Sequence, residues 1–487
     1  MAKRARFPVY RRLPAARVVA GSRAIPDTSD CFVSVLDWLG GEGADAASSA
    51  ERRAEHLLGA NEGLLRDMAV RADPMRRGGV PGIRFQTAAR VGAVPLLSPV
   101  TGRPDFGLVI EPRFAWASAG DMLAGMGFRV VPEFLPLPEL PQSERRVPPW
   151  VLSSVILKRL EDLLNSLQRR SATSQAILSA PRGQVDWTDY ATRRFARGRA
   201  LDVPCRFPDL RDDEELRAAI HWVVRRHRES LLSQMNAGLV VHRLLALCDL
   251  LLSKLSGTPP RMPIERDRSA WNRRPLLPKV FREGLQAIDW TVDERGLAGL
   301  SDLSGLSWRL DMAAFFEAWV ETIAESVARQ VGATLRSGRR QQTRVPMDWL
   351  PPSSGSQRSL LPDVVLERED VVVVLDAKYK RHAEDIERLG WSNADEALRE
   401  QHRNDVLQAL AYSTLFNAPR VVSCLVYPIA PEKWAELRRR GRTLHRAQVR
   451  TGERHVEMAL LSVPLSGDPL GAGEDLKQLV RRGLSEI

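Results

Sequence analysis

The last part of the chain shows two hydrophobic periods, one after the other. From Asp311 to about Leu335, apolar residues such as Phe315 and Trp319 recur every three to four positions, which predicts a helix with Asp311 as its N-cap. The apolar runs that follow are short and bounded by Pro and charged residues, which predicts strands. The predicted order is a helix, three strands, a helix and a strand, at residues 311–335, 343–350, 362–367, 371–380, 394–416 and 420–427.

The rest of the chain divides into a β-rich part and a helical part. Residues 50–72 predict a helix, and residues 84–135 predict strands because β-branched and aromatic residues alternate with Gly and Pro breaks. A Pro-rich linker at 133–149 precedes helical patterns, of which residues 239–255 are apolar nearly all round and therefore predict a buried helix. The other helical patterns lie at residues 150–170 and 214–232. We therefore predict an α+β multidomain fold with an N-terminal mixed β-rich region at 1–145, a helical middle domain at 146–305 and an α/β domain at 306–487.

The bulk composition favours a protein with an acidic partner. The chain has 71 Lys and Arg against 60 Asp and Glu, a formal charge of +11, which attracts nucleic acid first and an anionic membrane surface second. A generally basic surface without a ligand is the plain alternative. The four cysteines form no CxxC pair, which argues against a zinc ribbon or a thioredoxin-like site, and four thiols in a chain this long fit a reducing compartment better than a disulfide scaffold. No apolar stretch is long enough to cross a bilayer and the N-terminus lacks a signal-peptide core, so we expect a soluble, cytoplasmic protein with no membrane partner.

Two carboxylates and a lysine lie at one end of the predicted strand pair. Asp376 and Lys378 are two residues apart, so a strand directs both side chains to the same face. With Glu369 and Asp370 as the turn, Asp363 lies opposite Asp376, with Cβ atoms about 5 Å apart. Because Glu-Asp is not a favoured two-residue turn, a register that differs by one residue is also open.

Carboxylates that close together, at the end of a buried strand, need a cation. Mg²⁺ binds through few carboxylates and keeps several waters, and it can polarise a phosphate and help to make a nucleophilic hydroxide. A neighbouring Lys can orient the attacking water and offset developing charge. The residue types and their spacing therefore fit phosphodiester hydrolysis with Mg²⁺, for which Mn²⁺ is a substitute. The alternative is an ordinary β-hairpin with solvated charges at its ends.

The order of elements around these residues resembles the core of the PD-(D/E)xK nuclease fold, αβββαβ. The motifs resemble the McrC family, the nuclease subunits of modification-dependent (5-methylcytosine) restriction systems. Phe316-Glu317 on the first helix matches the family's Phe-Glu, and Asp405-Val-Leu-Gln408-Ala-Leu-Ala-Tyr412 matches its Asp-x-x-Gln-x-x-Ala-Tyr helix. A further segment, Arg182-Gly-Gln-Val-Asp-Trp187, resembles the family's Arg-Gly-x-Ile-Asp-Trp element. The resemblance is good over about 300–430, moderate over about 150–300 and thin before that.

The resemblance implies roles for the candidate residues. Asp363, Asp376 and Glu317 would bind the metal, Lys378 would position the nucleophile, and Gln408 would support it. From the residues alone, Glu317 is equally an ordinary acid on a helix surface, and Gln408 belongs to a helix packed on the sheet. The resemblance also implies DNA, in a modified form, as substrate, and an AAA+ GTPase ring of the McrB type as partner. GTP is expected only on that partner, because this chain has no GxxxxGK[ST] loop, and residues 1–145 are expected to contact the ring.

Three functions stay open from the sequence. The first is an Mg²⁺-dependent DNA endonuclease subunit of a restriction or phage-defence system. The second is a nuclease of DNA repair or recombination that works with a helicase. The third is a regulatory subunit that activates the ring motor and cleaves little DNA itself, against which the complete set of catalytic residue types argues.

Overall fold

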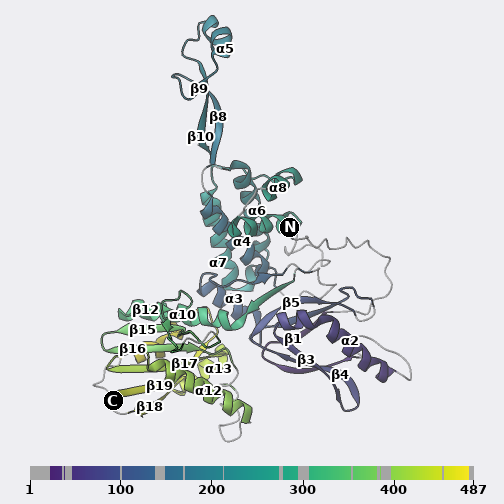
Figure 1. Ribbon diagram of the computed structural model, residues 1–487, viewed down its shortest axis with the longest axis vertical. Helices are drawn as coiled ribbons and strands as arrows, with labels where there is room; N and C mark the ends of the chain where they lie inside the picture. The colour runs from purple at the N-terminus through teal and green to yellow at the C-terminus, as the bar shows by residue number, and fades with distance from the viewer. Residues whose placement is uncertain are drawn as a thin grey trace. The chain divides into compact units, whose positions relative to one another are not determined.

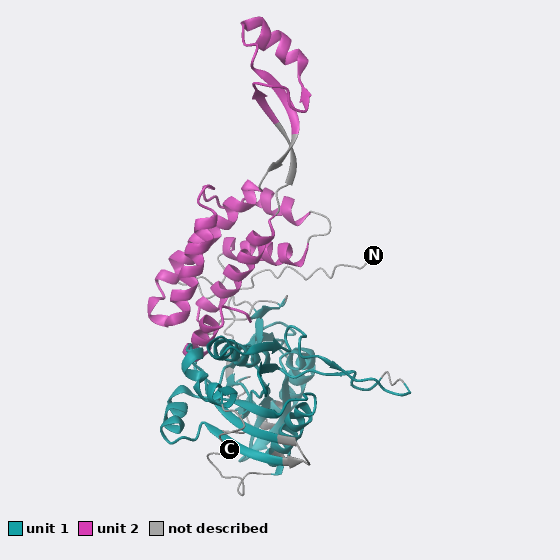
Figure 2. Cartoon of the chain, turned by 90° about the vertical axis from the view of Figure 1, so that its left-hand side faces the viewer, with its two compact units in different colours: residues 1–115, 132–146, 301–487 teal, residues 116–131, 147–300 magenta. Residues whose placement is uncertain are grey.

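The structure is a computed structural model, and residues from both ends of the chain belong to the same compact part of it. It describes residues 22–35, 38, 46–98, 101–135, 137, 148–167, 170–211, 213–273, 278–293, 307–351, 355–380, 384, 396–451 and 454–481. Figure 2 shows the two compact units, unit 1 with residues 1–115, 132–146 and 301–487, and unit 2 with residues 116–131 and 147–300. The predicted division into three consecutive domains stays a prediction.

Two small sheets and one long helix form the N-terminal part of unit 1. The first sheet has the order β1-β6-β5-β11-β7, in which β11 comes from the C-terminal part of the sequence. The second has the order β2-β4-β3, and α2 packs against β3 and β4. Their shared core contains Trp38, whose ring meets Phe85 and Phe106 edge-on. The elements are β1 (Ser22–Pro26), β2 (Asp30–Ser34), α2 (Ala46–Asp67), β3 (Val70–Arg77), β4 (Val80–Thr87), β5 (Arg90–Leu96), β6 (Phe106–Glu111), β7 (Glu133–Phe134) and β11 (Trp308–Asp311).

The C-terminal part of unit 1 is built on a six-stranded sheet of order β12-β15-β16-β17-β19-β18 (Figure 1). Strand β16 is central and buried, and it pairs antiparallel with β15 and parallel with β17. Helix α10 contacts β12, β15 and β16, whereas α12 contacts β16 and β17. Tyr412 of α12 packs on Val372 and Val374, so α12 covers the face of β16 that carries the even-numbered residues. The elements are α10 (Met312–Val331), β12 (Thr334–Ser337), β15 (Val364–Arg368), β16 (Val371–Ala377), α12 (Glu396–Ser413), β17 (Arg420–Ile429), α13 (Pro431–Arg439), β18 (Leu444–Thr451), β19 (Arg454–Pro464), α14 (Pro469–Ala472) and α15 (Glu474–Arg481).

The predicted order of helix, three strands, helix and strand is present here, but the first strand lies elsewhere. Asp311 caps α10 as predicted, since its side chain accepts hydrogen bonds from the backbone N–H groups of Ala313 and Ala314. The helix ends at Gly332, whose φ of 69° provides the left-handed C-cap. The chain is therefore free to form β12 at 334–337, which was expected to be the last turn of the helix. The strand predicted at 343–350 is reduced to β13 (Val345–Pro346), which pairs with β14 (Ser359–Leu360).

Unit 2 is a helical block, as the sequence predicted for this part of the chain. Its main helices are α3 (Trp116–Gly125), α4 (Trp150–Ser166), α6 (Glu214–Leu232), α7 (Leu239–Lys254), α8 (Glu265–Asn272) and α9 (Lys279–Val292). Helix α3 lies within a range predicted to form strands, so the prediction was wrong there. Helix α7 is not buried all round either, because Leu239 and Leu250 are exposed while Val241, Leu244 and Leu251 are buried. Among the described residues, none of the helices combines the length and apolar character that a membrane span requires.

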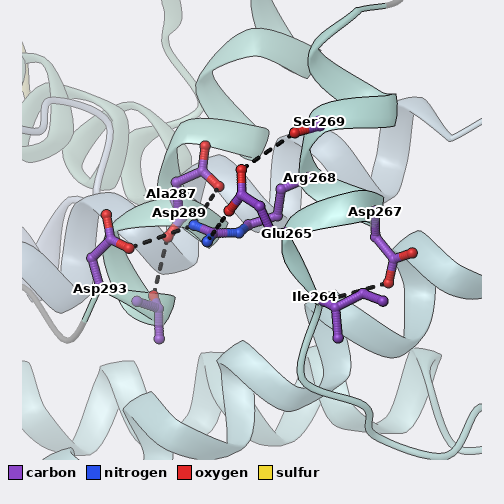
Figure 3. A network of polar contacts seen from close by, with 9 residues as sticks. Ile264, Glu265, Asp267, Arg268, Ser269, Ala287, Asp289 and Asp293 are labelled. Carbon is purple, nitrogen blue, oxygen red and sulfur yellow. Dashed lines mark hydrogen bonds and ion pairs between the residues drawn. The ribbon is translucent and has the colours of Figure 1, made fainter.

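One arginine joins α8 to α9 in unit 2 (Figure 3). The guanidinium of Arg268 lies 2.5 Å from the Glu265 carboxylate on its own helix and 3.5 Å from those of Asp289 and Asp293. Arg268 thus places one positive charge among three acids, and this holds the short helix α8 on the longer α9.

A three-stranded antiparallel sheet of order β8-β10-β9 completes the elements of unit 2 (Figure 1). Its strands are β8 (Arg170–Leu178), β9 (Gln184–Val185) and β10 (Val203–Arg211). Between β9 and β10 the chain forms the short helical segments α5 (Trp187–Asp189), η1 (Tyr190–Arg194) and η2 (Phe195–Arg197). Near these segments, Ile177, Trp187, Phe195 and Leu201 are large apolar side chains that remain exposed.

Because unit 2 contains a buried histidine, we expect it to lose stability in acid. His227 lies 3.0 Å from the hydroxyl groups of both Ser153 and Thr291, and burial lowers its pKa to about 3. Below the unfolded pKa of about 6.5, the unfolded chain binds a proton that the folded chain does not, so the free energy of unfolding falls with pH by up to about 1.4 kcal/mol per unit. At pH 5 the loss relative to pH 7.5 is expected to be about 2 kcal/mol.

Urea denaturation at both pH values measures this loss. His227→Gln, which cannot titrate, should lose most of the difference between the two pH values, whereas His242→Gln at an exposed position of α7 should keep it. Equal pH dependence of the wild type and His227→Gln would contradict the assignment.

Candidate active site

The predicted hairpin forms with the predicted register. Val364 pairs with Leu375 and Val365 with Val374, so Asp363 comes next in the ladder opposite Asp376. Strand β16 ends at Ala377, and Lys378 follows directly. The two aspartates and the lysine are therefore brought to one end of the central strand, as the sequence indicated.

The two aspartates are costly to ionise side by side. Asp376 is buried, with 3% of its surface exposed, and Asp363 is half-buried. Burial raises the pKa of both carboxyls, and for Asp363 the negative charges of Asp376 and Glu317 raise the pKa further. The backbone N–H of Ala377 donates a hydrogen bond of 2.8 Å to Oδ2 of Asp363, which offsets part of this rise.

Lys378 connects the hairpin to helix α12. Its Nζ lies 2.8 Å from Oδ2 of Asp376 and donates a hydrogen bond of 2.8 Å to Oε1 of Gln408. The amide of Gln408 in turn donates to the hydroxyl of Tyr412 at 2.9 Å. Burial alone lowers the pKa of Lys378, but the charge of Asp376 and its hydrogen bond outweigh this, so the pKa is raised and the ammonium form is favoured. Lys378 is thus a fixed positive charge whose direction is set by Gln408.

Glu317 interacts electrostatically with Asp376 of the hairpin. It is half-buried on α10, and burial raises its pKa, with further contributions from Glu321, Asp311 and Asp376 that the charge of Arg339 opposes. Within the described part of the chain, no group of three or more His, Cys, Asp or Glu side chains is gathered closely enough to hold a metal ion. The structure therefore brings together Asp363, Asp376, Lys378 and Gln408, while a metal-binding role of Glu317 stays a prediction.

The aspartate pair has the properties of a cation site. Oxygen ligands are those that Mg²⁺ prefers, and a divalent charge relieves the repulsion between buried carboxylates. Oδ2 of Asp376 is buried and, apart from its ion pair with Lys378, receives no well-formed hydrogen bond. Asp363 and Asp376 thus fit a divalent cation by their chemistry and burial.

A second group of residues, which no pattern in the sequence indicated, supports this site. Tyr379, next to Lys378, points to the opposite face of the strand and donates a hydrogen bond of 2.8 Å to Oδ2 of Asp27, at the end of β1. The backbone N–H of Arg113 donates to the other oxygen of Asp27 at 2.7 Å. The Arg113 guanidinium lies 4.7 Å from the centre of the Tyr379 ring and donates to the carbonyl of Lys380. The N-terminal sheet thus holds the residues that directly follow Lys378.

Removing the Tyr379 hydroxyl is expected to destabilise unit 1. In Tyr379→Phe the buried Asp27 carboxylate loses a hydrogen bond, so the free energy of unfolding should fall by about 1–3 kcal/mol. Tyr190→Phe is the matched control, because its hydroxyl bonds to Ala200 at an exposed place and its loss should cost about 0.5 kcal/mol or less. Urea denaturation of the full chain measures both, and equal losses would contradict the bracing role of Tyr379.

The candidate residues lie in the part of the chain that matches a known family. Residues 297–428 match the profile of the family described as McrBC 5-methylcytosine restriction system component. No curated protein gives a significant match to the chain. Among solved structures, one that resembles the chain is a refined half-complex from a tetradecameric assembly of Thermococcus gammatolerans McrB AAA+ hexamers with bound McrC, at 14% identity and a TM-score of 0.40, covering 94% of this chain and 99% of that one.

A second solved structure is the cryo-EM structure of the Thermococcus gammatolerans McrBC complex, at 14% identity and a TM-score of 0.25, covering 63% of this chain and 88% of that one. The family profile spans Glu317, Asp363, Asp376, Lys378 and Gln408. Over residues 297–428, the chain is therefore similar to the McrBC 5-methylcytosine restriction system components, in agreement with the resemblance found in the sequence.

Proposed function

We propose that the chain is the Mg²⁺-dependent endonuclease subunit of a DNA restriction system and that its C-terminal part is a PD-(D/E)xK nuclease core. The observation that carries the proposal is the buried pair Asp363 and Asp376, adjacent across β15 and β16, with the Lys378 ammonium at the same place. The helix–strand–strand–strand–helix–strand order around the pair is the order of that nuclease core, and the family match over residues 297–428 supports the restriction system.

Asp363 and Asp376 would hold the metal, with Glu317 as a further oxygen ligand. Bound there, Mg²⁺ supplies charge to polarise the phosphodiester and to lower the pKa of a water molecule. Lys378 places a positive charge where the phosphate gains negative charge, which favours the transition state over the ground state. Gln408 fixes the lysine through its amide oxygen, and Tyr412 fixes the orientation of that amide.

We further propose that the chain works with a partner AAA+ GTPase ring that binds the GTP and moves the DNA. The matching family is described as a component of the McrBC 5-methylcytosine restriction system, so further components are expected. This chain has no phosphate-binding GxxxxGK[ST] loop of its own. The expected contact through residues 1–145 stays a prediction. Trp187 and Phe195 are exposed and both lie against the ring of Tyr190. We assign this exposed aromatic group to a protein partner as a second surface, because exposed apolar patches mark interaction sites.

Cleavage of methylated and unmethylated plasmid tests the proposal. The full chain is assayed with Mg²⁺, with and without an AAA+ GTPase of the McrB type and with or without GTP. Cleavage that requires the GTPase and GTP supports the restriction subunit. Cleavage without a partner would favour the repair or recombination nuclease, and a stimulated GTPase without cleavage would favour the regulatory subunit.

A further inference from the structure

The chain between β12 and β15 is far longer than the connection between paired strands requires. Ser337 at the end of β12 pairs with Val364 at the start of β15, and two residues suffice to join antiparallel neighbours. Instead the chain continues through two described segments, 338–351 and 355–362, which we call the β12–β15 insert. It contains the short pair β13 and β14, in which Val345 lies opposite Leu360.

The first part of the β12–β15 insert is fixed to the two peptide groups on either side of the candidate aspartate, Asp363. The backbone N–H of Gly338 donates a hydrogen bond of 2.7 Å to the carbonyl of Asp363. The hydroxyl of Thr343 donates to the carbonyl of Pro362 at 2.6 Å. A Cβ atom at Gly338 would lie 2.5 Å from that same carbonyl oxygen, so only glycine allows this close approach. The first part of the insert is therefore anchored to the backbone of the residue that carries one of the two candidate carboxylates.

The insert presents apolar side chains that nothing in the described part of the chain covers. Leu350 is 93% exposed, the highest value for a large apolar side chain among the described residues, and the neighbouring Trp349 is 42% exposed. The indole N–H of Trp349 donates to the carbonyl of Gln357 at 2.7 Å, which fixes the ring at the surface. The strand pair continues to this point, since the N–H of Met347 donates to the carbonyl of Arg358 at 2.8 Å.

The charge of the insert is strongly positive. Residues 338–362 contain four arginines, one aspartate and no lysine or glutamate. Arg340 pairs with Glu321 and Glu325, and Arg339 pairs with Glu321. Arg344 and Arg358 are exposed, and neither makes an ion pair with any described residue. Two exposed cations therefore lie on the same β12–β15 insert as an exposed tryptophan and an exposed leucine.

We propose that the β12–β15 insert is a DNA-contact surface of this chain. Arg344 and Arg358 bind backbone phosphates, and Trp349 and Leu350 pack against bases or sugars of the strand held at the site. Arginines satisfy a polyanion, and aromatic or aliphatic side chains stack on bases or wedge between them. The excess of arginine over acidic residues in the insert favours a polyanion over an apolar protein partner. The inference rests on the proposed function, because it takes DNA as the substrate.

The test measures binding of a labelled DNA duplex to the full chain by fluorescence anisotropy, in EDTA so that no cleavage occurs, over a range of NaCl concentrations. Arg344→Ala with Arg358→Ala should weaken binding and reduce the slope of log K against log salt by about 1.8, since each phosphate contact contributes about 0.9. Trp349→Ala with Leu350→Ala should weaken binding about tenfold without changing the slope, because stacking releases no counterions.

The control residues are of the same types but lie outside the β12–β15 insert. Arg329 is in the last turn of α10 and Arg368 ends β15, so Arg329→Ala with Arg368→Ala should leave affinity and slope unchanged. Leu470→Ala, an exposed leucine of α14, should also bind as the wild type does. Thermal unfolding checks that each variant is folded.

Wild-type affinity and slope in both insert variants would overturn the proposal, as would loss of GTPase stimulation without loss of DNA binding, which would assign the surface to a protein partner. A wild type that binds no DNA at any salt concentration would overturn it too. Failure of the proposed nuclease function and failure of the DNA-contact proposal give different results. Cleavage by the wild type with unchanged DNA binding by the insert variants would leave the proposed function intact, and weakened binding by the variants without any wild-type cleavage would leave the insert proposal intact.

Discussion

Replacing Asp376 with asparagine is expected to reduce Mg²⁺-dependent DNA cleavage by about a thousandfold or more, because removing one group that holds a metal or stabilises developing charge costs about this much. The amide has nearly the shape of the carboxylate, so the strand and its register should persist. Two functions are lost together. The cation loses a buried oxygen ligand, and Lys378 loses the anion 2.8 Å from its Nζ. Cleavage of plasmid at saturating Mg²⁺ measures the loss.

Glu367→Gln is the matched control for this variant. Glu367 lies on the same hairpin but toward the other end of β15, where it pairs with Arg336. It should retain cleavage within about twofold, since surface substitutions away from special features change little. Retention of more than a tenth of wild-type cleavage by Asp376→Asn would remove Asp376 from the mechanism.

The metal-free chain is expected to become more stable when Asp363 is replaced by asparagine. Burial and the charges of Asp376 and Glu317 raise the pKa of Asp363, so the folded chain holds a proton that the unfolded chain releases above its usual pKa near 4. Stability contributed by this group is therefore present at low pH and lost as pH rises through the raised value. At pH 8 in EDTA, Asp363→Asn should raise the free energy of unfolding on the order of 2–4 kcal/mol, and the gain should shrink toward pH 5.

Urea denaturation at pH 8 and pH 5 measures this gain. Asp370→Asn, in the exposed turn between β15 and β16, is expected to change the free energy of unfolding by about 0.5 kcal/mol or less at both pH values. A less stable Asp363→Asn protein at pH 8 would mean that the carboxylate is stabilised by its surroundings without a metal. That result would contradict the claim that the paired carboxylates destabilise the chain unless a cation is bound.

Local patterns in the sequence were enough to predict the hairpin that carries the site. Five apolar residues before Asp376 require a covered strand, and Glu369 at φ 50° allows the two-residue turn that sets the register, although Glu-Asp is not a preferred turn sequence. The order of elements followed from periods of 3.6 and 2. The position of β12 did not, because the helical pattern runs past Gly332 and only the left-handed φ of that residue ends the helix.

Contacts between distant parts of the chain could not be predicted in the same way. Tyr379 and Asp27 are separated by 352 positions, and nothing near either residue indicates the other. Strand β11 similarly joins the N-terminal sheet from just before α10 and pairs with β5, and no local signal in the sequence indicates this pairing. The family resemblance implied only that Gln408 supports the nucleophile, whereas its hydrogen bond to Lys378 appears only in the structure.

The central claim is that Asp363 and Asp376 together hold a divalent cation. Calorimetric titration of Mn²⁺ into the metal-free wild-type chain at pH 7.5, in two buffers with different heats of ionisation, tests it most directly. We predict that the wild type binds Mn²⁺ with release of protons, since metal ligands must be deprotonated and both carboxyls have raised pKa values. The Asp363→Asn, Asp376→Asn double variant should show no such binding. Equal binding by the double variant, or no binding by the wild type, would contradict the account.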